Sequence, residues 1–142
     1  MKTHTSIIAL FTLAVAFAPP LSKIASADTG TYAARLMSPT AGQVLVPGKQ
    51  VKVTWTAAFP PVDLSWCEME IWLSLDGGKS FLYQITAQLD PRISFFYWTV
   101  PNTPTNAAVL DVRFGCEGYY PESYSPQPAS TFAIAANTAT SY

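Results

Sequence analysis

Short runs in which apolar and polar residues alternate recur along this chain, between turns rich in proline and glycine. In VKVTWT, Val51, Val53 and Trp55 alternate with polar residues directly after a Pro-Gly turn. The same alternation is found in residues 68–75, 81–85, 109–114 and 132–134. Successive side chains of a strand point to opposite faces, so each run predicts a β-strand with one buried face. No segment after residue 27 shows a competing helical period.

Two further segments complete the predicted set of strands. Residues 93–100 (ISFFYWTV) are apolar on both faces and stop before Pro101, which cannot donate a hydrogen bond to a neighbouring strand. An irregular first strand is expected over residues 34–37 and 44–46. About seven strands in roughly 100 residues are typical of an all-β sandwich of two sheets, immunoglobulin-like or fibronectin type III-like.

The N-terminus has the pattern of a secretory signal peptide. Lys2 precedes an apolar run over residues 7–18, and the Ala-Ser-Ala sequence at 25–27 provides the small residues of a cleavage site. The alternative is a membrane anchor, but the run is shorter than the roughly 20 residues of a spanning helix. The expected organisation is a signal peptide at 1–27, a sandwich domain at 28–135 and a tail at 136–142. The protein is therefore expected to be exported, to the periplasm or to the extracellular cell surface, with no membrane span.

The charge of the exported chain argues against nucleic acid as a partner. All nine acidic residues follow the predicted signal peptide, whereas Lys2 and Lys23 belong to it, so six basic residues remain. Binding of a nucleic acid needs clustered Lys and Arg side chains that contact phosphates. We therefore expect no nucleic-acid partner.

The histidine content excludes several kinds of active site. His4 is the only histidine and lies in the predicted signal peptide. Ser-His-Asp and Cys-His nucleophile systems, and histidine-ligated zinc or copper sites, all need an imidazole. The prediction is a protein that is not an enzyme and that carries no cofactor and no metal.

The two cysteines are predicted to form a disulfide. Cys67 begins the strand over residues 67–75, and Cys116 ends the strand that contains residues 109–114. In a sandwich of this strand order the two strands are antiparallel neighbours, so the start of one lies beside the end of the other. Export places both cysteines in an oxidising compartment. The alternative is a pair of reactive thiols, which usually has close spacing beside a helix start.

Two segments rich in aromatic residues are expected at the cysteine end of the sandwich. They are the predicted loops over residues 57–66 (AAFPPVDLSW) and 115–129 (GCEGYYPESYSPQPA). The candidate binding side chains in these loops are Phe59, Trp66, Tyr119, Tyr120 and Tyr124. Exposed Tyr and Trp rings suit stacking on a sugar or anchoring of a protein contact. The alternative is that these rings pack on each other and seal the end of the sandwich.

The outward face of the strand over residues 67–75 carries two carboxylates and a tryptophan. Glu68 and Glu70 lie about 7 Å apart on one face, within the range of a glycosidase pair. An acid catalyst needs a cleft that raises its pKa, and none is expected on this face. We therefore interpret the two glutamates as a solvated charged surface, with Arg113 opposite. Trp72 on the same face is a candidate for an assembly contact, or for packing on a neighbouring strand.

The stretch SLDGGKSF, residues 74–81, fits the Ser-x-Asp-x-Gly-x-Ser/Thr-aromatic pattern of the Asp-box hairpin of sialidases. Asp76, Gly77 and Gly78 are expected to form a turn, because Gly adopts positive φ and Asp accepts hydrogen bonds from turn amides. A returning strand is expected to begin at Ser80 and Phe81. A calcium site is not expected, because the acids are isolated. The turn is predicted to lie far from the two aromatic loops.

Four longer stretches resemble one family of secreted modules. They are SPTAGQVLVPGKQVKVTWT, IWLSLDGGKSF, WTVPNTPTNAAVLDVRF and STFAI, and together they cover nearly all of residues 37–134. These stretches are similar to bacterial secreted immunoglobulin-like modules, which have a fungal cell-wall relative. The resemblance implies the sandwich fold. Members of this family occur as accessory or adhesive modules and as small exported proteins.

The sequence leads to one functional hypothesis with two alternatives. The hypothesis is a small exported, non-catalytic binding module whose two aromatic loops recognise a cell-surface or wall glycan, or a protein. The alternative is a structural or assembly subunit that self-associates or joins an extracellular or cell-envelope complex or filament. A carboxylate-based glycosidase is a remote alternative.

Overall fold

A computed structural model describes residues 30–137. The predicted signal peptide at residues 1–27 lies outside the described residues, as does the end of the predicted tail, residues 138–142. Among the residues that the structure describes, no helix combines the length and the apolar composition needed to cross a membrane.

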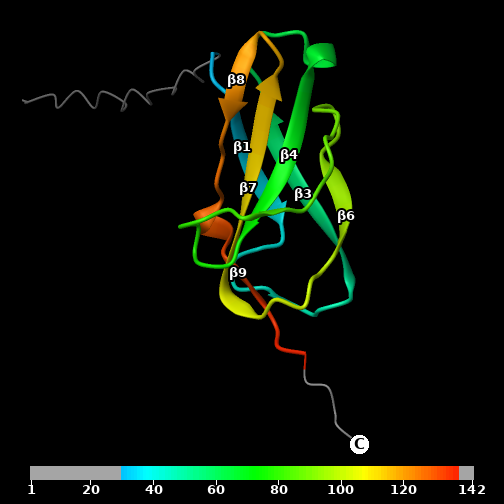
Figure 1. Ribbon diagram of the computed structural model, residues 1–142, viewed down its shortest axis with the longest axis vertical. Helices are drawn as coiled ribbons and strands as arrows, with labels where there is room; N and C mark the ends of the chain where they lie inside the picture. Colours follow the sequence, from blue (N-terminus) through cyan, green and yellow to red (C-terminus); the bar gives the residue numbers. More distant parts are fainter. Residues whose placement is uncertain (1–29, 138–142) are drawn as a thin grey trace, which may run out of the picture.

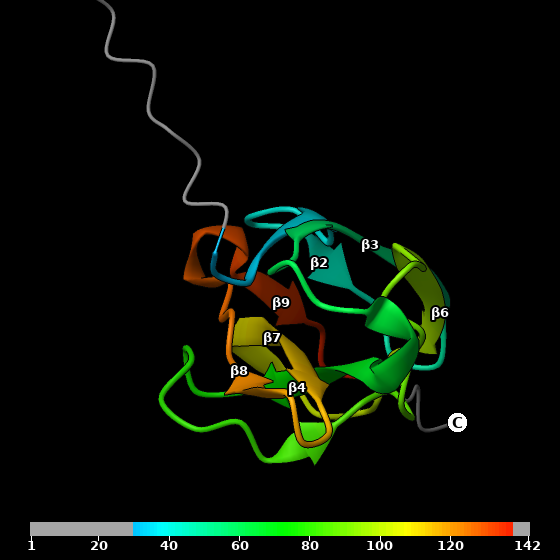
Figure 2. The ribbon, with the colours of Figure 1, turned by 90° about the horizontal axis from the view of Figure 1, so that it is seen from above.

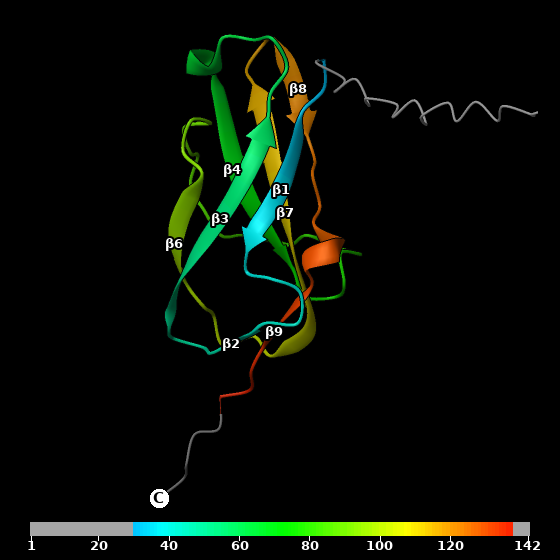
Figure 3. The ribbon, with the colours of Figure 1, turned by 180° about the vertical axis from the view of Figure 1, so that it is seen from behind.

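The described chain forms two sheets that pack face to face (Figures 1, 2 and 3). One sheet has the order β1-β3-β6, with β1 at Ala33–Ser38, β3 at Gln50–Ala58 and β6 at Phe95–Thr99. The other has the order β2-β9-β7-β4-β5, with β2 at Val44–Leu45, β9 at Phe132–Ile134, β7 at Thr105–Cys116, β4 at Cys67–Ser74 and β5 at Tyr83–Gln84. Strand β8, Tyr120–Ser123, pairs with β7, and the short 3-10 turns η1 and η2 span Leu64–Trp66 and Pro128–Ser130. The prediction of an all-β immunoglobulin-like sandwich is confirmed.

Alternate residues of the predicted strands fill the space between the sheets. In β3, Val53 and Trp55 are buried, whereas Lys52 and Thr56 face the solvent. The buried residues that alternate along β4 and β7 include Met69, Ile71, Leu73, Leu110, Val112 and Phe114. Burial of each such side chain stabilises the fold by roughly 1.5–3 kcal/mol relative to exposure. The period-two pattern of the sequence therefore corresponds to the core.

Strands β4 and β7 form the central antiparallel pair. All eight residues of β4 have a partner in β7, from Cys67 opposite Cys116 to Ser74 opposite Val109. The cysteine Cα atoms are 3.9 Å apart, and the two sulfurs form a bond of 2.05 Å. The predicted disulfide is therefore confirmed, at the start of β4 and the end of β7.

The expected long loop over residues 115–129 is largely absent, and this prediction was wrong. A three-residue turn at 117–119 connects β7 to β8, and the Tyr119 N–H donates to the Cys116 carbonyl at 3.1 Å. Gly118 adopts a φ of 73° in this turn. The sequence of β8, YPES, does not alternate, and Pro121 is tolerated because β8 lies at the margin of its sheet. Together with the division of the first strand into β1 and β2, β8 accounts for the strands beyond the expected seven.

The Asp76 turn contains an extensive set of hydrogen bonds. The Asp76 Oδ1 atom accepts from the Ser74 hydroxyl at 2.6 Å and from the amides of Lys79 and Ser80 at 3.1 and 2.9 Å. Its Oδ2 atom accepts from the Ser80 hydroxyl at 2.6 Å. These bonds hold residues 79 and 80 in the turn, so the returning strand β5 begins at Tyr83, and the predicted start at Ser80 was wrong.

Glycines make the backbone of this turn possible. Gly77 and Gly78 have φ values of 78° and 86°, a conformation that residues with a Cβ rarely adopt. The Gly77 N–H donates to the Ala107 carbonyl at 2.8 Å, which attaches the turn to β7. The turn follows the last residue of β4, so the length of this strand separates it from Cys67 by about 23 Å.

The Asp76 carboxyl group should stay ionised at a lower pH than a free aspartate does. The hydroxyls of Ser74 and Ser80, and then the turn amides, hold the pKa of Asp76 well below its usual range. The folded-state pKa lies below the unfolded value of about 3.9, so the ionised turn stabilises the fold above about pH 4. That stabilisation is lost as the pH falls through the folded-state pKa. Carbon-13 NMR titration should find Asp76 ionised at about pH 3, where a free Asp is mostly protonated.

The Ser80→Ala variant should raise the pKa of Asp76, because it removes the hydroxyl that donates to Oδ2. Ser123→Ala is the matched control, since the Ser123 hydroxyl donates to the Pro121 carbonyl instead. An Asp76 that titrates like a free aspartate in the wild-type protein would contradict the described turn.

Candidate ligand-binding site

The connection from β3 to β4 and the turn from β7 to β8 lie at the same end of the sandwich, at the top of Figure 1. The first ends in η1, whose last residue, Trp66, directly precedes Cys67. The second begins directly after Cys116. Because Cys67 and Cys116 are bonded, the disulfide connects the bases of both segments.

A pocket of about 400 Å³ lies between these two segments, and we call it the tip pocket. It is lined by Pro61, Val62, Asp63, Trp66 and Tyr119. The rings of Trp66 and Tyr119 are unusually open to solvent, with exposed fractions of 66% and 76%. Two accessible aromatic rings and a proline can contact a flat or apolar ligand group, and Asp63 adds a negative charge.

Asp63 is held in position by η1. Its Oδ1 atom accepts hydrogen bonds from the Ser65 amide at 2.9 Å and from the Ser65 hydroxyl at 2.7 Å. These bonds, with a smaller effect from the charge of Arg92, hold the pKa of Asp63 below its usual range. The carboxylate is therefore ionised at neutral pH. The Asp-x-Ser pattern of residues 63–65 is typical of such a turn and could have drawn attention to Asp63 in the sequence.

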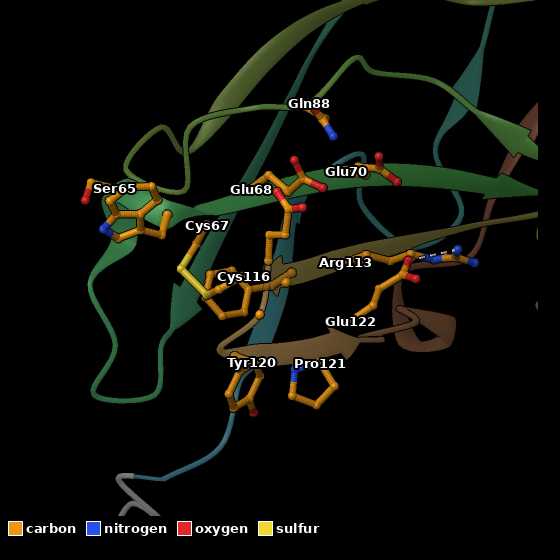
Figure 4. A pocket seen from close by; sticks show the side chains of 15 residues that line it. Ser65, Cys67, Glu68, Glu70, Gln88, Arg113, Cys116, Tyr120, Pro121 and Glu122 are labelled. Carbon is orange, nitrogen blue, oxygen red and sulfur yellow. Dashed lines mark hydrogen bonds and ion pairs between the residues drawn. A yellow bond between two sulfur atoms is a disulfide. The ribbon is translucent and has the colours of Figure 1, made fainter.

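A larger groove of about 830 Å³ continues from the tip onto the outward face of β4, β7 and β8, and we call it the acidic groove. Trp66 lines both cavities. The charged residues of the acidic groove are Glu68, Glu70, Arg113, Glu117 and Glu122. Figure 4 shows Glu68 and Glu70 on one strand, with Arg113 and Glu122 across from them on the neighbouring strands.

The expectation that this face would offer no cleft was therefore wrong. Strand β8 lies beside β7 on one side of the groove. On the other side, residue Leu89 pairs with Met69 of β4, and this brings Gln88 to the groove wall. Both flanking segments are positioned by tertiary contacts that the alternation of residues within β4 could not reveal.

Arg113 is already engaged by other residues of the sheet. Its Nε donates to Asp111 Oδ2 at 2.7 Å, and Nη1 lies 3.4 Å from Glu122 Oε1. Its guanidinium carbon lies 4.4 Å from the ring centre of Trp72 and 4.7 Å from that of Tyr124. Its charge is therefore compensated within the protein.

The cross-strand ion pair expected between Glu70 and Arg113 is not formed. Glu70 is opposite Arg113 in the strand register, yet Arg113 forms its ion pairs with Asp111 and Glu122. Glu70 instead accepts a hydrogen bond from the Trp72 indole at 3.0 Å. Trp72 is half-buried and packs on the neighbouring strand, which was the alternative considered for it.

The five aromatic candidates of the expected loops divide into two groups. Phe59 and Tyr120 pack on the buried ring of Phe114, with ring centres 5.0 and 5.7 Å away. The exposed group consists of Trp66, Tyr119 and Tyr124, the last with an exposed fraction of 60%. Only Trp66 and Tyr119 line the tip pocket. Phe59 thus lines neither cavity, and Tyr120 packs on the core and also lines the acidic groove. Trp66 and Tyr119 are the rings that a ligand can reach in the tip pocket.

No family model, no curated protein and no solved structure matches the chain. The resemblance to secreted modules stays a prediction. The fold and the two cavities define an immunoglobulin-like sandwich with an aromatic, acidic surface at its cysteine end. Within residues 30–137, no group of three or more His, Cys, Asp or Glu side chains has an arrangement that could hold a metal ion.

Proposed function

We propose that this protein is an exported, non-catalytic binding module that recognises a cell-surface or wall glycan, or a protein, through its tip pocket. The observation that carries the proposal is the placement of two exposed rings, Trp66 and Tyr119, around one pocket. Exposed large aromatic rings at a cavity are typical of binding hot spots. The core packing of Phe59 and Tyr120 and the disulfide hold the segments that carry these rings.

Export is part of the proposal. It is supported by the signal-peptide pattern of residues 1–27 and by the disulfide, because disulfides persist mainly in oxidising compartments. A binding module at a cell surface or in the periplasm would meet glycans and other exported proteins there.

The proposal predicts that ligand binding depends on the two rings of the tip. Screening the purified protein on glycan and peptide arrays should identify a ligand, and the Trp66→Ala/Tyr119→Ala double variant should bind it at least about tenfold more weakly. Both rings are exposed, so the variant should keep the unfolding free energy of the wild type to within about 0.5 kcal/mol. Isothermal calorimetry and denaturant unfolding would measure the two effects.

Tyr83→Ala is the matched control, because Tyr83 is an exposed tyrosine of β5, which pairs with the far part of β4. It should leave binding unchanged. Full binding by the double variant, or the absence of any ligand on both arrays, would contradict the proposed function.

One observation favours a second candidate function, which is assembly with other chains through β6. Strand β6 forms an edge of the three-stranded sheet, and its outward residues Phe95 and Tyr97 are exposed. The sequence of β6, FFYWT, contains none of the charges or prolines that usually protect an edge from pairing with another chain. Size-exclusion chromatography with light scattering would show a concentration-dependent oligomer if assembly is the function.

A carboxylate-based glycosidase stays the remote alternative, through Glu68 and Glu70 of the acidic groove.

A further inference from the structure

The tip pocket combines aromatic faces with the Asp63 carboxylate, of which only one oxygen accepts hydrogen bonds from residues 30–137. Trp66 and Tyr119 provide the rings, and no Lys or Arg is among the residues that line this pocket. Both hydrogen bonds of the Asp63 carboxylate go to Oδ1. The Oδ2 atom accepts no hydrogen bond from residues 30–137, so it is available to a donor on a ligand. Aromatic faces next to a carboxylate attract a cationic group.

The surroundings of the tip pocket strengthen its negative charge. The acidic groove next to it is lined by Glu68, Glu70, Glu117 and Glu122. The only basic residue that lines the groove, Arg113, is paired with Asp111 and Glu122. Arg92, whose charge acts on Asp63, is paired with Asp90 at 3.2 Å. Both cations are therefore compensated, and the two cavities together favour a ligand with positive charge.

The protein itself shows how these residue types hold a guanidinium group. Arg113 lies between the rings of Trp72 and Tyr124, at 4.4 and 4.7 Å, and pairs with two carboxylates. A planar guanidinium both stacks on aromatic rings and donates to carboxylates, which a lysine ammonium does less well. The tip pocket presents the same residue types, a Trp, a Tyr and an Asp, to the outside.

We propose that the tip pocket binds an arginine side chain of an extended basic peptide segment, whose other basic residues lie along the acidic groove. The inference rests on the proposed function and specifies the partner as a protein. Glu68 and Glu70 are about 7 Å apart along β4, a spacing that alternate side chains of an extended peptide also have. Three of the groove carboxylates, Glu68, Glu70 and Glu117, form no ion pair within residues 30–137, and each can accept a charge-assisted hydrogen bond from Arg or Lys.

Selection from a random decapeptide library displayed on phage tests this inference with the purified protein. Enriched peptides should contain arginine with at least one further basic residue, and replacing the key arginine by the neutral isostere citrulline should weaken binding at least about tenfold. Raising the salt concentration from about 50 to about 500 mM should also weaken binding, because the attraction is electrostatic. Enrichment of uncharged peptides, or equal binding of the citrulline peptide, would overturn the inference.

Two variants test whether the arginine of the bound peptide lies in the tip pocket. Asp63→Asn keeps an Oδ1 acceptor for Ser65 but removes the negative charge, and it should weaken binding of the selected peptide about tenfold. Tyr119→Ala should have a similar effect, and Tyr83→Ala should have none. Unchanged affinity in Asp63→Asn would overturn the inference.

The outcomes separate this inference from the proposed function. Binding of a neutral or amino-sugar oligomer that requires Trp66 and Tyr119, without any enriched basic peptide, would overturn the peptide inference and leave the proposed function in place. Failure of every glycan and peptide to bind through Trp66 and Tyr119 would overturn both.

Discussion

Replacing both cysteines, Cys67→Ala/Cys116→Ala, should lower the free energy of unfolding by about 4 kcal/mol, because the unfolded chain then regains the freedom of the released loop. The two cysteines are 49 residues apart, and the disulfide directly bridges opposite residues of the central strand pair. A stabilisation of about 4 kcal/mol is a large part of the 5–15 kcal/mol that is typical of a small domain. Guanidinium chloride unfolding, followed by circular dichroism, would measure the difference.

Reduction of the wild-type protein provides the control for this experiment. The reduced protein should unfold at the same denaturant concentration as the double variant, because both lack the cross-link. The variant should also bind the tip ligand more weakly, since the disulfide connects the bases of the two segments that form the tip pocket. A loss of stability below about 1 kcal/mol would show that the cross-link is not a major determinant of the fold.

Truncation of the buried ring at the cysteine end, Phe114→Ala, should lower the free energy of unfolding by about 3–5 kcal/mol. Phe114 is 1% exposed and contacts three other rings, those of Tyr32, Phe59 and Tyr120, at centre distances of 5.0, 5.0 and 5.7 Å. Its removal leaves a cavity under both segments of the tip. Urea unfolding of the oxidised protein would measure this effect with the disulfide intact.

The control for this truncation is Phe95→Ala on the outer face of β6. Phe95 is 43% exposed, with the Lys52 ammonium 4.2 Å from its ring centre and the ring of Tyr97 beside it. Its truncation should cost less than about 1 kcal/mol, because little buried area is lost. If the two truncations cost the same, Phe114 would not be the centre of the aromatic cluster.

Much of the fold could be predicted from residue alternation because the buried face of each long strand repeats every second residue. Residues 51–56 and 109–114 therefore fall within β3 and β7, and the run at 68–75 falls within β4 except for its last residue. Strand β8 was missed because its pairing with β7 follows from the tight turn at Gly118, and its own sequence carries no alternation. Strand β5 starts later than expected because the hydrogen bonds of Asp76 extend the turn.

The candidate site was only partly predictable. The pairing of Cys67 with Cys116 follows from strand order, which the alternating runs indicate. The division of the aromatic residues does not, because rings in connections have no period that separates Phe59 from Trp66. The acidic groove is formed by β8 and by the segment around Gln88, both placed by tertiary contacts.

The most direct test of the central claim is NMR mapping of a ligand selected on the arrays or from the peptide library. Nitrogen-15 spectra of the protein with and without this ligand would report on the backbone amides and on the four indole N–H groups. The proposed function predicts that the largest shifts occur at the amides of residues 62–66 and 117–119 and at the indole of Trp66, with the buried Trp98 unaffected. Shifts concentrated at residues 95–99 of β6, with an unchanged Trp66 indole, would contradict a binding site at the tip.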